Sequence, residues 1–194
     1  MVLTSDEEIS SPYSGPLVRA WAARSRYTFV CEPARPNGAM VIQRKGVAVY
    51  QITLRGRAAH AGANPQDGVS AVSELARWIS ELDKLTDYQA GTTLNMGLIS
   101  GGEAKNAVPA LAQGTLDVRF TTPAALASVE ERLHELARSA RAGIAAQWTQ
   151  SGFRPPMNPV EATAALCASV CAVARRAGSA EPAFVASGGA SDGN

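Results

Sequence analysis

The sequence predicts a mixed α/β protein in which one domain is inserted into another. Two stretches carry apolar residues at the three-and-four spacing of amphipathic helices, near 69–85 and 123–141. Four other stretches read as β-strands, near 47–57, 91–100, 108–120 and 144–151. In chain order these elements give βαββαβ, the split arrangement called ferredoxin-like. The segments on either side lack this order, which favours an outer domain formed by both ends of the chain.

The central unit is predicted from the periodicity of its apolar residues. In VAVYQITLRGR, alternation places four apolar side chains on one face of the strand: Ala48, Tyr50, Ile52 and Leu54. A loop dense in Gly, Pro, Asn and Asp follows, and then the first helix, whose apolar positions are Val69, Val72, Leu75, Ala76, Ile79, Leu82 and Leu85. Pro123 suits the first turn of the second helix, whose inward positions are Leu126, Val129, Leu133, Leu136 and Ala137.

The outer segments are less regular. The first contains a helix-like stretch, SGPLVRAWAARS, and a short apolar run, YTFVCEPA, which we expect to be a buried strand that ends at Glu32. The second begins with FRPPMNP, continues as a helix near 160–177 and finishes at SGGASDGN. Because such a Gly/Ser/Asp loop usually leads into another element, we expect the chain to be an internal fragment of a longer protein.

Composition excludes several classes of function. With 18 basic and 17 acidic residues, the net charge of +1 gives no sign of a nucleic-acid groove or a membrane surface. No apolar run approaches the roughly 18–20 residues of a membrane span. Three cysteines argue against a disulfide framework, and MVLTSDEEIS does not resemble a signal peptide, so we expect a cytoplasmic location.

Three features could carry chemistry. Glu7 and Glu8 are adjacent carboxylates, so one could bind a metal while the other handles a proton; such a pair is also common as a solvated charge run. Glu32 stands where sites are built at the ends of strands, although such residues also serve as surface or capping groups. His60 is one of only two histidines and is flanked by small residues.

Taken together, the motifs resemble those of one known family. TSDEEIS, CEPA, RKG, GRAAHAGANPQDG, TTLNMGLISGGEAKNAVP, LDVRF, RPPM and SGGASDGN occur in the order seen in zinc-dependent aminoacylase/carboxypeptidase-type metallopeptidases. This group includes glutamate carboxypeptidase, which the chain resembles most, acetylornithine deacetylase and succinyl-diaminopimelate desuccinylase. The resemblance covers essentially the whole chain, and its most specific parts are the AHAG loop and the GGEAKNAVP turn.

The resemblance implies an architecture and a reaction. Residues 1–44 and 152–194 would form an incomplete catalytic α/β domain of the zinc-peptidase type, and 45–151 a ferredoxin-like lid and dimerisation domain. Such enzymes hydrolyse an amide beside a free carboxylate, in a peptide or an N-acyl amino acid, with two zinc ions per active site. Glu7 matches the general base, and Glu8 and Glu32 match metal ligands. Cobalt or manganese would also suit these ligand types.

The resemblance also assigns roles to lid residues. His60 would reach across a homodimer and donate a hydrogen bond to the oxyanion formed in the partner's active site. Asn106 and Arg119 match residues that contact the substrate, and Arg119 suits a bidentate grip on a carboxylate. Arg119 could instead be a strand residue with its head in solvent. His134 reads as a solvated helix residue, and Asp192 receives no metal or proton role.

The family pattern is incomplete here, because five zinc-ligand positions are needed and two are present. We therefore expect this chain alone to be almost inactive. The alternative is a non-enzymatic ferredoxin-like module for dimerisation or small-ligand binding. A ferredoxin-like RNA-binding domain is disfavoured, since its central strands would need exposed stacking aromatics and offer only Phe120.

Overall fold

The computed structural model describes residues 1–33 and 35–194; Ala34, the last residue of the EPA motif, lies outside the described residues. The chain divides into two compact units. A central unit comprises Val47–Phe153, and an outer unit combines Met1–Gly46 with Arg154–Asn194. That the outer unit is an incomplete catalytic domain stays a prediction.

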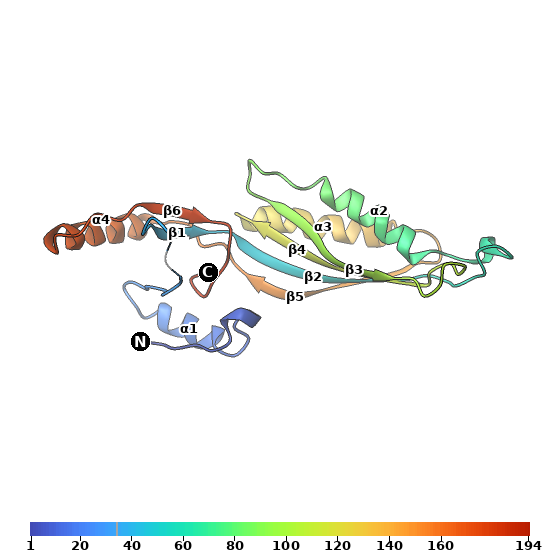
Figure 1. The fold of residues 1–194 in the computed structure, drawn as a ribbon, viewed down its shortest axis with the longest axis horizontal. Helices are drawn as coiled ribbons and strands as arrows, with labels where there is room; N and C mark the ends of the chain where they lie inside the picture. The colour runs from blue at the N-terminus through green and yellow to red at the C-terminus, as the bar shows by residue number, and fades with distance from the viewer. Residues whose placement is uncertain (34) are drawn as a thin grey trace. The chain divides into compact units, whose positions relative to one another are not determined.

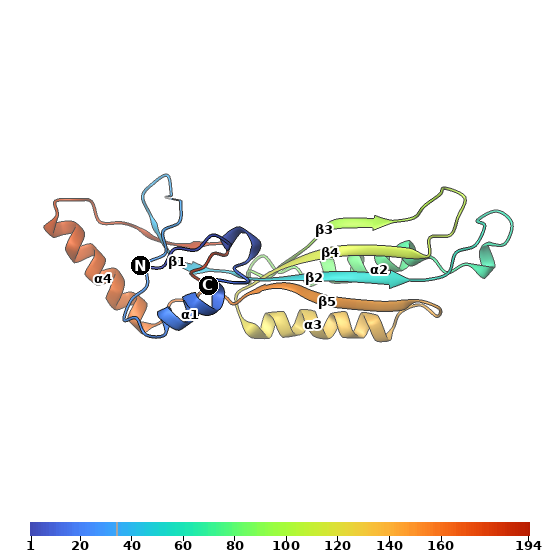
Figure 2. The same ribbon diagram turned by 90° about the horizontal axis from the view of Figure 1, so that it is seen from below.

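The central unit has the expected ferredoxin-like topology. Its elements are β2 (Gly46–Arg55), α2 (Ala71–Asp83), β3 (Thr93–Gly101), β4 (Leu111–Phe120), α3 (Pro123–Arg138) and β5 (Ala145–Arg154). The sheet order is β3-β4-β2-β5, as Figure 2 shows. β3 and β4 are antiparallel, with a register shift between Met96 and Leu98. The βαββαβ prediction is thus confirmed, with β5 three residues longer at its end than expected.

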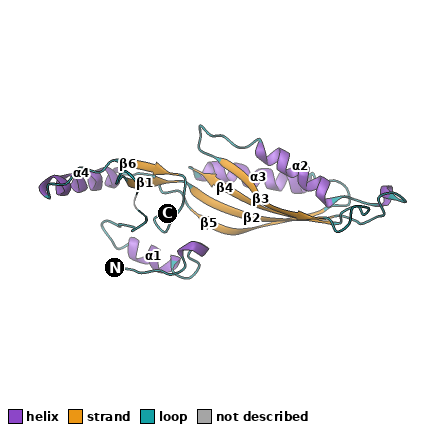
Figure 3. Ribbon diagram, viewed as in Figure 1, coloured by secondary structure: helices purple, strands orange, loops and turns teal. Residues whose placement is uncertain are grey.

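Both helices of this unit cover one face of the sheet (Figures 1 and 3). The side chains predicted to point inward from β2 are buried: Ala48, Tyr50, Ile52 and Leu54. The same holds for α3, through Leu126, Val129, Leu133 and Leu136. These residues form one continuous core with the inward residues of β4 and α2, because alternation along a strand and the helical repeat both place them on the facing surfaces.

Helix α2 is turned slightly from its predicted orientation. Its buried residues are Ala71, Glu74, Leu75, Trp78 and Leu82. Val72, predicted to face inward, is 37% exposed, because burial of the large Trp78 indole turns a neighbouring stripe of the helix toward the sheet.

The other face of the sheet is polar. Gln51 accepts a hydrogen bond from the Thr115 hydroxyl at 2.9 Å, and Asp117 and Arg119 lie on the same face of β4. Phe120 is buried on the helix side, at 1% exposure. It is therefore not available to stack on a nucleic-acid base, which agrees with the argument against RNA binding.

The outer unit has fewer regular elements. They are η1 (Glu7–Ile9), α1 (Gly15–Ala22), β1 (Met40–Arg44), α4 (Glu161–Arg176) and β6 (Phe184–Ser187). The sequence predicted the two α-helices, α1 and α4. β1 and β6 pair in parallel. Neither strand was predicted, because each is only four or five residues long and partly exposed.

The prediction of a strand that ends at Glu32 is wrong. Residues 27–33 contain no strand and are exposed throughout. An apolar run becomes a strand only where a neighbour pairs with its backbone, and the two-stranded sheet of this unit is made by β1 and β6 instead.

Candidate functional site

His60 lies on a loop, residues 57–69, that links β2 to α2 and is held at its base. Arg57 and Val69 exchange two backbone hydrogen bonds, of 3.0 and 2.8 Å. Glycine is required at both sides of this base, since a Cβ on Gly56 would lie 2.0 Å from the Val69 carbonyl oxygen and one on Gly68 would lie 2.8 Å from Val108. The glycines of GRAAHAGANPQDG therefore let the two chain segments approach closely.

The loop is also fixed to the turn that precedes β4. His60 and Ala107 form an isolated antiparallel bridge. The Ala61 N–H donates to the Asn106 carbonyl at 2.8 Å, and the Val108 N–H donates to the Ala59 carbonyl at 2.9 Å. The AHAG loop and the GGEAKNAVP turn, singled out in the sequence, thus lie side by side and bring His60 and Asn106 together.

The His60 imidazole is held in one orientation and one tautomer. Its Nδ1 accepts the backbone N–H groups of Gly62 and Ala63, at 3.1 and 3.0 Å. A ring nitrogen that accepts hydrogen bonds carries no proton, so the proton of the neutral ring lies on Nε2. The residue is exposed. The loop therefore presents a single N–H donor to solvent.

Arg119 lies at the opposite end of β4 from the His60 loop. Leu111 begins the strand next to the GGEAKNAVP turn, and eight residues at the usual rise place Arg119 about 26 Å further along. Its guanidinium makes a bidentate pair with Asp117, at 2.7 and 2.8 Å. Within one chain, therefore, Arg119 does not lie near His60. The guanidinium of Arg119 already binds a carboxylate, that of Asp117.

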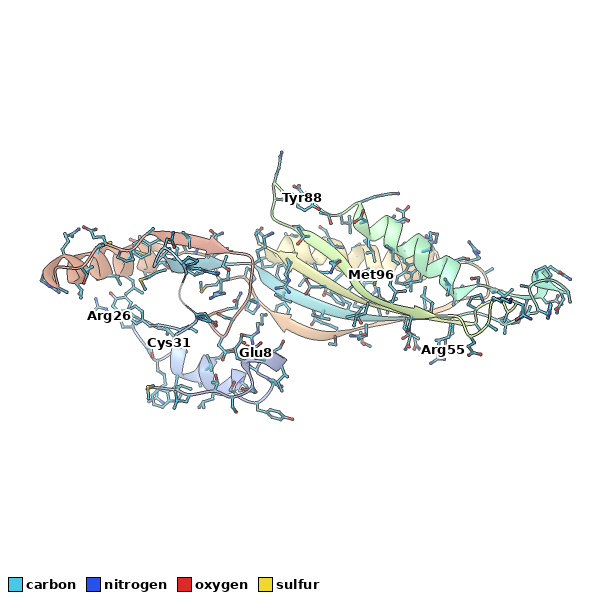
Figure 4. The ribbon with its side chains drawn as sticks, viewed as in Figure 1. Glu8, Arg26, Cys31, Arg55, Tyr88 and Met96 are labelled. Carbon is cyan, nitrogen blue, oxygen red and sulfur yellow. The ribbon has the colours of Figure 1, made fainter. Side chains whose placement is uncertain are left out.

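The predicted acidic residues lie in the outer unit. Glu7 and Glu8 are consecutive residues of η1, and Glu8 is exposed (Figure 4). Glu7 is half-buried, and burial raises the pKa of its carboxyl, an effect that the Arg154 charge opposes and the charge of Glu32 reinforces. A carboxyl with a raised pKa binds and releases a proton closer to neutrality than an ordinary one.

Arg154 organises this part of the outer unit, a role that is not predicted from the residue pattern. Its side chain, 12% exposed, donates to Asp192 at 2.9 Å and to the Glu7 carbonyl at 2.8 Å, and lies 3.3 Å from the Glu7 carboxylate. It also donates to the Ser11 hydroxyl at 3.1 Å. Arg154 is the first residue of the RPPM motif, and this motif is the one sequence signal that points to it.

Asp192 joins the last loop to the first segment. It accepts hydrogen bonds from Thr4 and Ser11 as well as from Arg154. Burial alone would raise the pKa of this carboxyl, but these hydrogen bonds outweigh burial and hold the pKa below its ordinary value. Asp192 thus carries a negative charge that fixes Arg154 beside Glu7.

The charge of Glu32 acts on Glu7, but within the described residues Glu32 belongs to no group of three possible metal ligands. It lines a largely apolar cavity of about 460 Å³ beside β1 and α4, and it is the one acidic residue among the described residues of the wall. Over residues 1–33 and 35–194, no group of three His, Cys, Asp or Glu side chains is placed to hold a metal ion. Because zinc sites in proteins need three or four protein ligands, Glu8 and Glu32 do not fit a zinc centre by themselves.

In the part of the chain that the structure describes, His134 has no hydrogen bond or ion pair with the other candidate site residues. It lies on α3 with its ring 4.9 Å from that of Trp148, and it is exposed.

None of the described helices is long and apolar enough to cross a membrane.

Comparison with known proteins decides the family. Residues 42–143 match the M20_dimer family, described as "Peptidase dimerisation domain", and this match covers more than half of the chain. The chain belongs to this family. The matched residues cover the central unit from β2 to α3, including the His60 loop, and end just before β5.

Relatives of the M20 chain are named as hydrolases. Acetylornithine deacetylase of Myxococcus xanthus is 35% identical over 120 residues, which are 56% of this chain and 31% of that protein. Carboxypeptidase G2 of Pseudomonas sp. (strain RS-16) is 28% identical over 140 residues, 70% of this chain and 34% of that protein. The M20 chain thus spans about a third of the length of these relatives.

A solved structure shares the fold over nearly the whole chain. The crystal structure of aminopeptidase PepT from Bacillus cereus ATCC 10987 superposes with a TM-score of 0.77 at 24% identity, and covers 98% of this chain and 51% of that one. Both units of the M20 chain therefore have counterparts in that peptidase fold, in agreement with the predicted mixed α/β class.

Proposed function

We propose that this chain is part of an M20-type hydrolase that cleaves an amide bond beside a free carboxylate. Peptidases of this family are generally metal-dependent, and the relatives include a protein named as a deacetylase and one named as a carboxypeptidase. The observation that carries the proposal is the His60 loop, which presents one N–H donor on an exposed surface of a dimerisation domain. A fixed donor of this kind suits an oxyanion, whose negative charge develops in the transition state of amide hydrolysis.

His60 would act on the active site of a second copy. Asn106, held beside it by the Ala61 and Val108 hydrogen bonds, would contact the same substrate. Arg119 would grip a substrate carboxylate only after release of Asp117, since both carboxylate oxygens of Asp117 now occupy its guanidinium. A substrate site built from both chains would require the homodimer.

The β3 edge is our proposed dimer surface. β3 is an edge strand, and Leu98 and Ile99 on it are 68% and 59% exposed. The opposite edge strand, β5, is more polar: it exposes Gln147, Thr149, Gln150 and Ser151, and its one exposed large apolar residue is Phe153, at its end. An apolar edge with unpaired backbone groups is unfavourable in water and is covered well by a second strand, so β3 is the edge at which we expect a second copy to pair.

The outer unit would contribute part of the catalytic machinery. Glu7, with its raised pKa and with Arg154 beside it, would take up and release a proton. Glu8 and Glu32 stay our proposed metal ligands in a complete enzyme, with zinc, cobalt or manganese as the ion. Two carboxylates do not make such a site, so the isolated chain should neither retain zinc nor hydrolyse substrate.

A chimera would test the proposed role of His60. Val47–Phe153 would replace the corresponding domain of carboxypeptidase G2, and hydrolysis of an N-acyl glutamate would be measured. We expect His60→Ala to lower kcat by about 10²–10³-fold, as removal of one oxyanion donor does, and the control His134→Ala to leave kcat unchanged. Full activity of His60→Ala in an active chimera would refute the assignment.

Elemental analysis of the 194-residue chain, loaded with zinc and desalted, would test the outer unit. We expect less than one zinc ion per chain and no hydrolysis. Two retained zinc ions, with activity abolished by Glu7→Gln, would show that the described residues do form a metal centre.

A further inference from the structure

One side chain links His60 to the rest of its loop. The Oδ1 atom of Asn64 accepts the backbone N–H of His60 at 3.3 Å, and its Nδ2 donates to Oδ2 of Asp67 at 3.0 Å. The backbone N–H of Asn64 donates in turn to the His60 carbonyl at 3.1 Å. Asn64 therefore holds both backbone groups of His60, and Asp67 fixes the Asn64 amide.

These contacts close the turn that surrounds the imidazole. Residues 61–63 lie between His60 and Asn64, and the N–H groups of Gly62 and Ala63 both point at Nδ1. If the ends of the turn separated, these two donors would no longer converge on one atom. An exposed imidazole without such donors exchanges its proton between the two nitrogens.

Asp67 is itself well placed to act as an anchor. It ends η2 (Pro65–Asp67), whose first residue is a proline that fixes the backbone after Asn64. The Asp67 N–H donates to the Asn64 carbonyl at 3.1 Å, and its own carbonyl accepts from Nε of Arg57 at the loop base. The Asp67 backbone is thus tied to the base of the loop, its carboxylate accepts from the Asn64 amide, and Asn64 transmits this constraint to His60.

We propose that Asn64 and Asp67 are positioning residues that keep the His60 ring proton on Nε2 by closing the turn whose backbone amides bind Nδ1. The inference rests on the proposed function of His60 as a hydrogen-bond donor. The other loop contacts, Arg57 with Val69 and Ala61 with Asn106, fix the base and flank of the loop but do not close the turn.

The test is the nitrogen NMR spectrum of the histidine rings in the full 194-residue chain, recorded in alkaline buffer where histidine is neutral. With only two histidines, His134→Gln assigns every signal. We expect His60 in the natural sequence to show a hydrogen-bonded, unprotonated Nδ1 and a protonated Nε2. A spectrum averaged over both tautomers would overturn the proposal.

Variants exchange the donor and acceptor of the Asn64–Asp67 pair. Asn64→Asp places two carboxylates together and removes the donor, so the His60 signals should move toward the averaged values. The double variant Asn64→Asp with Asp67→Asn restores one donor and one acceptor, with the roles reversed, and should restore the natural spectrum. Unchanged signals in Asn64→Asp, or a double variant that stays averaged, would refute the proposal. Backbone spectra of the core residues would show that each variant is folded.

The chimera separates this inference from the proposed function. If the tautomer changes as expected but His60→Ala retains full activity, the positioning stands and the proposed function fails. If His60→Ala loses activity while Asn64→Asp changes neither spectrum nor kcat, the proposed function stands and the positioning fails.

Discussion

Arg154 and Asp192 form a nearly buried ion pair, with 2.9 Å between Nη1 and Oδ1, although 38 residues separate them in the chain. Their side chains are 12% and 11% exposed. This pair and the contacts of Arg154 with the Glu7 carbonyl and the Ser11 hydroxyl join the first and last segments of the outer unit. Glu7, the carboxylate proposed for proton transfer, lies beside Arg154. Asp192, near the end of the chain, holds Arg154 in this position.

Arg154→Met should destabilise the outer unit by about 2–4 kcal/mol, because it leaves Asp192 charged, largely buried and without its cation. The matched control is Arg175→Met, which breaks the exposed pair with Glu181 and should cost less than about 0.5 kcal/mol. Hydrogen exchange with mass spectrometry would measure both effects in peptides from Met1–Gly46 and Arg154–Asn194. Equal protection in Arg154→Met and the natural sequence would contradict the structural role.

The Asp192 carboxyl should make the outer unit sensitive to acid. Its pKa is lowered below the ordinary 3.8, so its stabilising contribution is complete above pH 3.8 and is lost as pH falls through the lower, folded-state pKa. Asp192→Asn should remove this dependence and should be less stable at neutral pH. Unfolding of the outer unit followed between about pH 5 and pH 2 would check the slope. A natural chain and an Asp192→Asn variant with the same acid profile would show that another group is responsible.

Glu74 should be essential to the core of the central unit. Its side chain is fully buried and accepts hydrogen bonds from Arg77, from the Trp78 indole at 3.2 Å and from the Arg141 backbone at 3.4 Å. Glu74→Ala leaves the buried indole N–H without its acceptor and should cost about 1–3 kcal/mol. The control Glu131→Ala breaks an exposed pair with Arg138 and should cost at most about 0.5 kcal/mol. Urea unfolding monitored by tryptophan fluorescence would measure both, and a loss below about 1 kcal/mol in Glu74→Ala would count against this account.

Periodicity was sufficient to predict most of the central unit, because a helix or strand with one buried face repeats its apolar residues at a fixed interval. This is why Leu126, Val129, Leu133 and Leu136 were placed correctly. It failed at Glu74, since a pattern of apolar residues cannot identify a charged side chain that is buried with its own donors.

The sequence was sufficient to name candidate site residues, but not to predict how their side chains are arranged. The AHAG and GGEAKNAVP motifs identified His60 and Asn106 as candidates, and their roles stay proposals. The tautomer of His60 depends on two backbone amides whose direction no residue pattern specifies. Arg154 was missed because a single arginine at the end of a strand is usually solvated, and its partners come from segments far away in the chain.

Ile99→Lys should weaken self-association if β3 is the dimer edge. Ile99 and Leu98 are exposed on this edge, and a lysine there would place a charge in the apolar surface that a second copy covers. We expect the dimer dissociation constant to rise at least about tenfold, equivalent to about 1.4 kcal/mol. The control is Val160→Lys in the outer unit, where the valine is 64% exposed and belongs to no proposed interface. Analytical ultracentrifugation over a range of concentrations would measure both variants. A natural chain that stays monomeric at all concentrations, or an Ile99→Lys dimer of unchanged affinity, would exclude the β3 edge as the dimer surface.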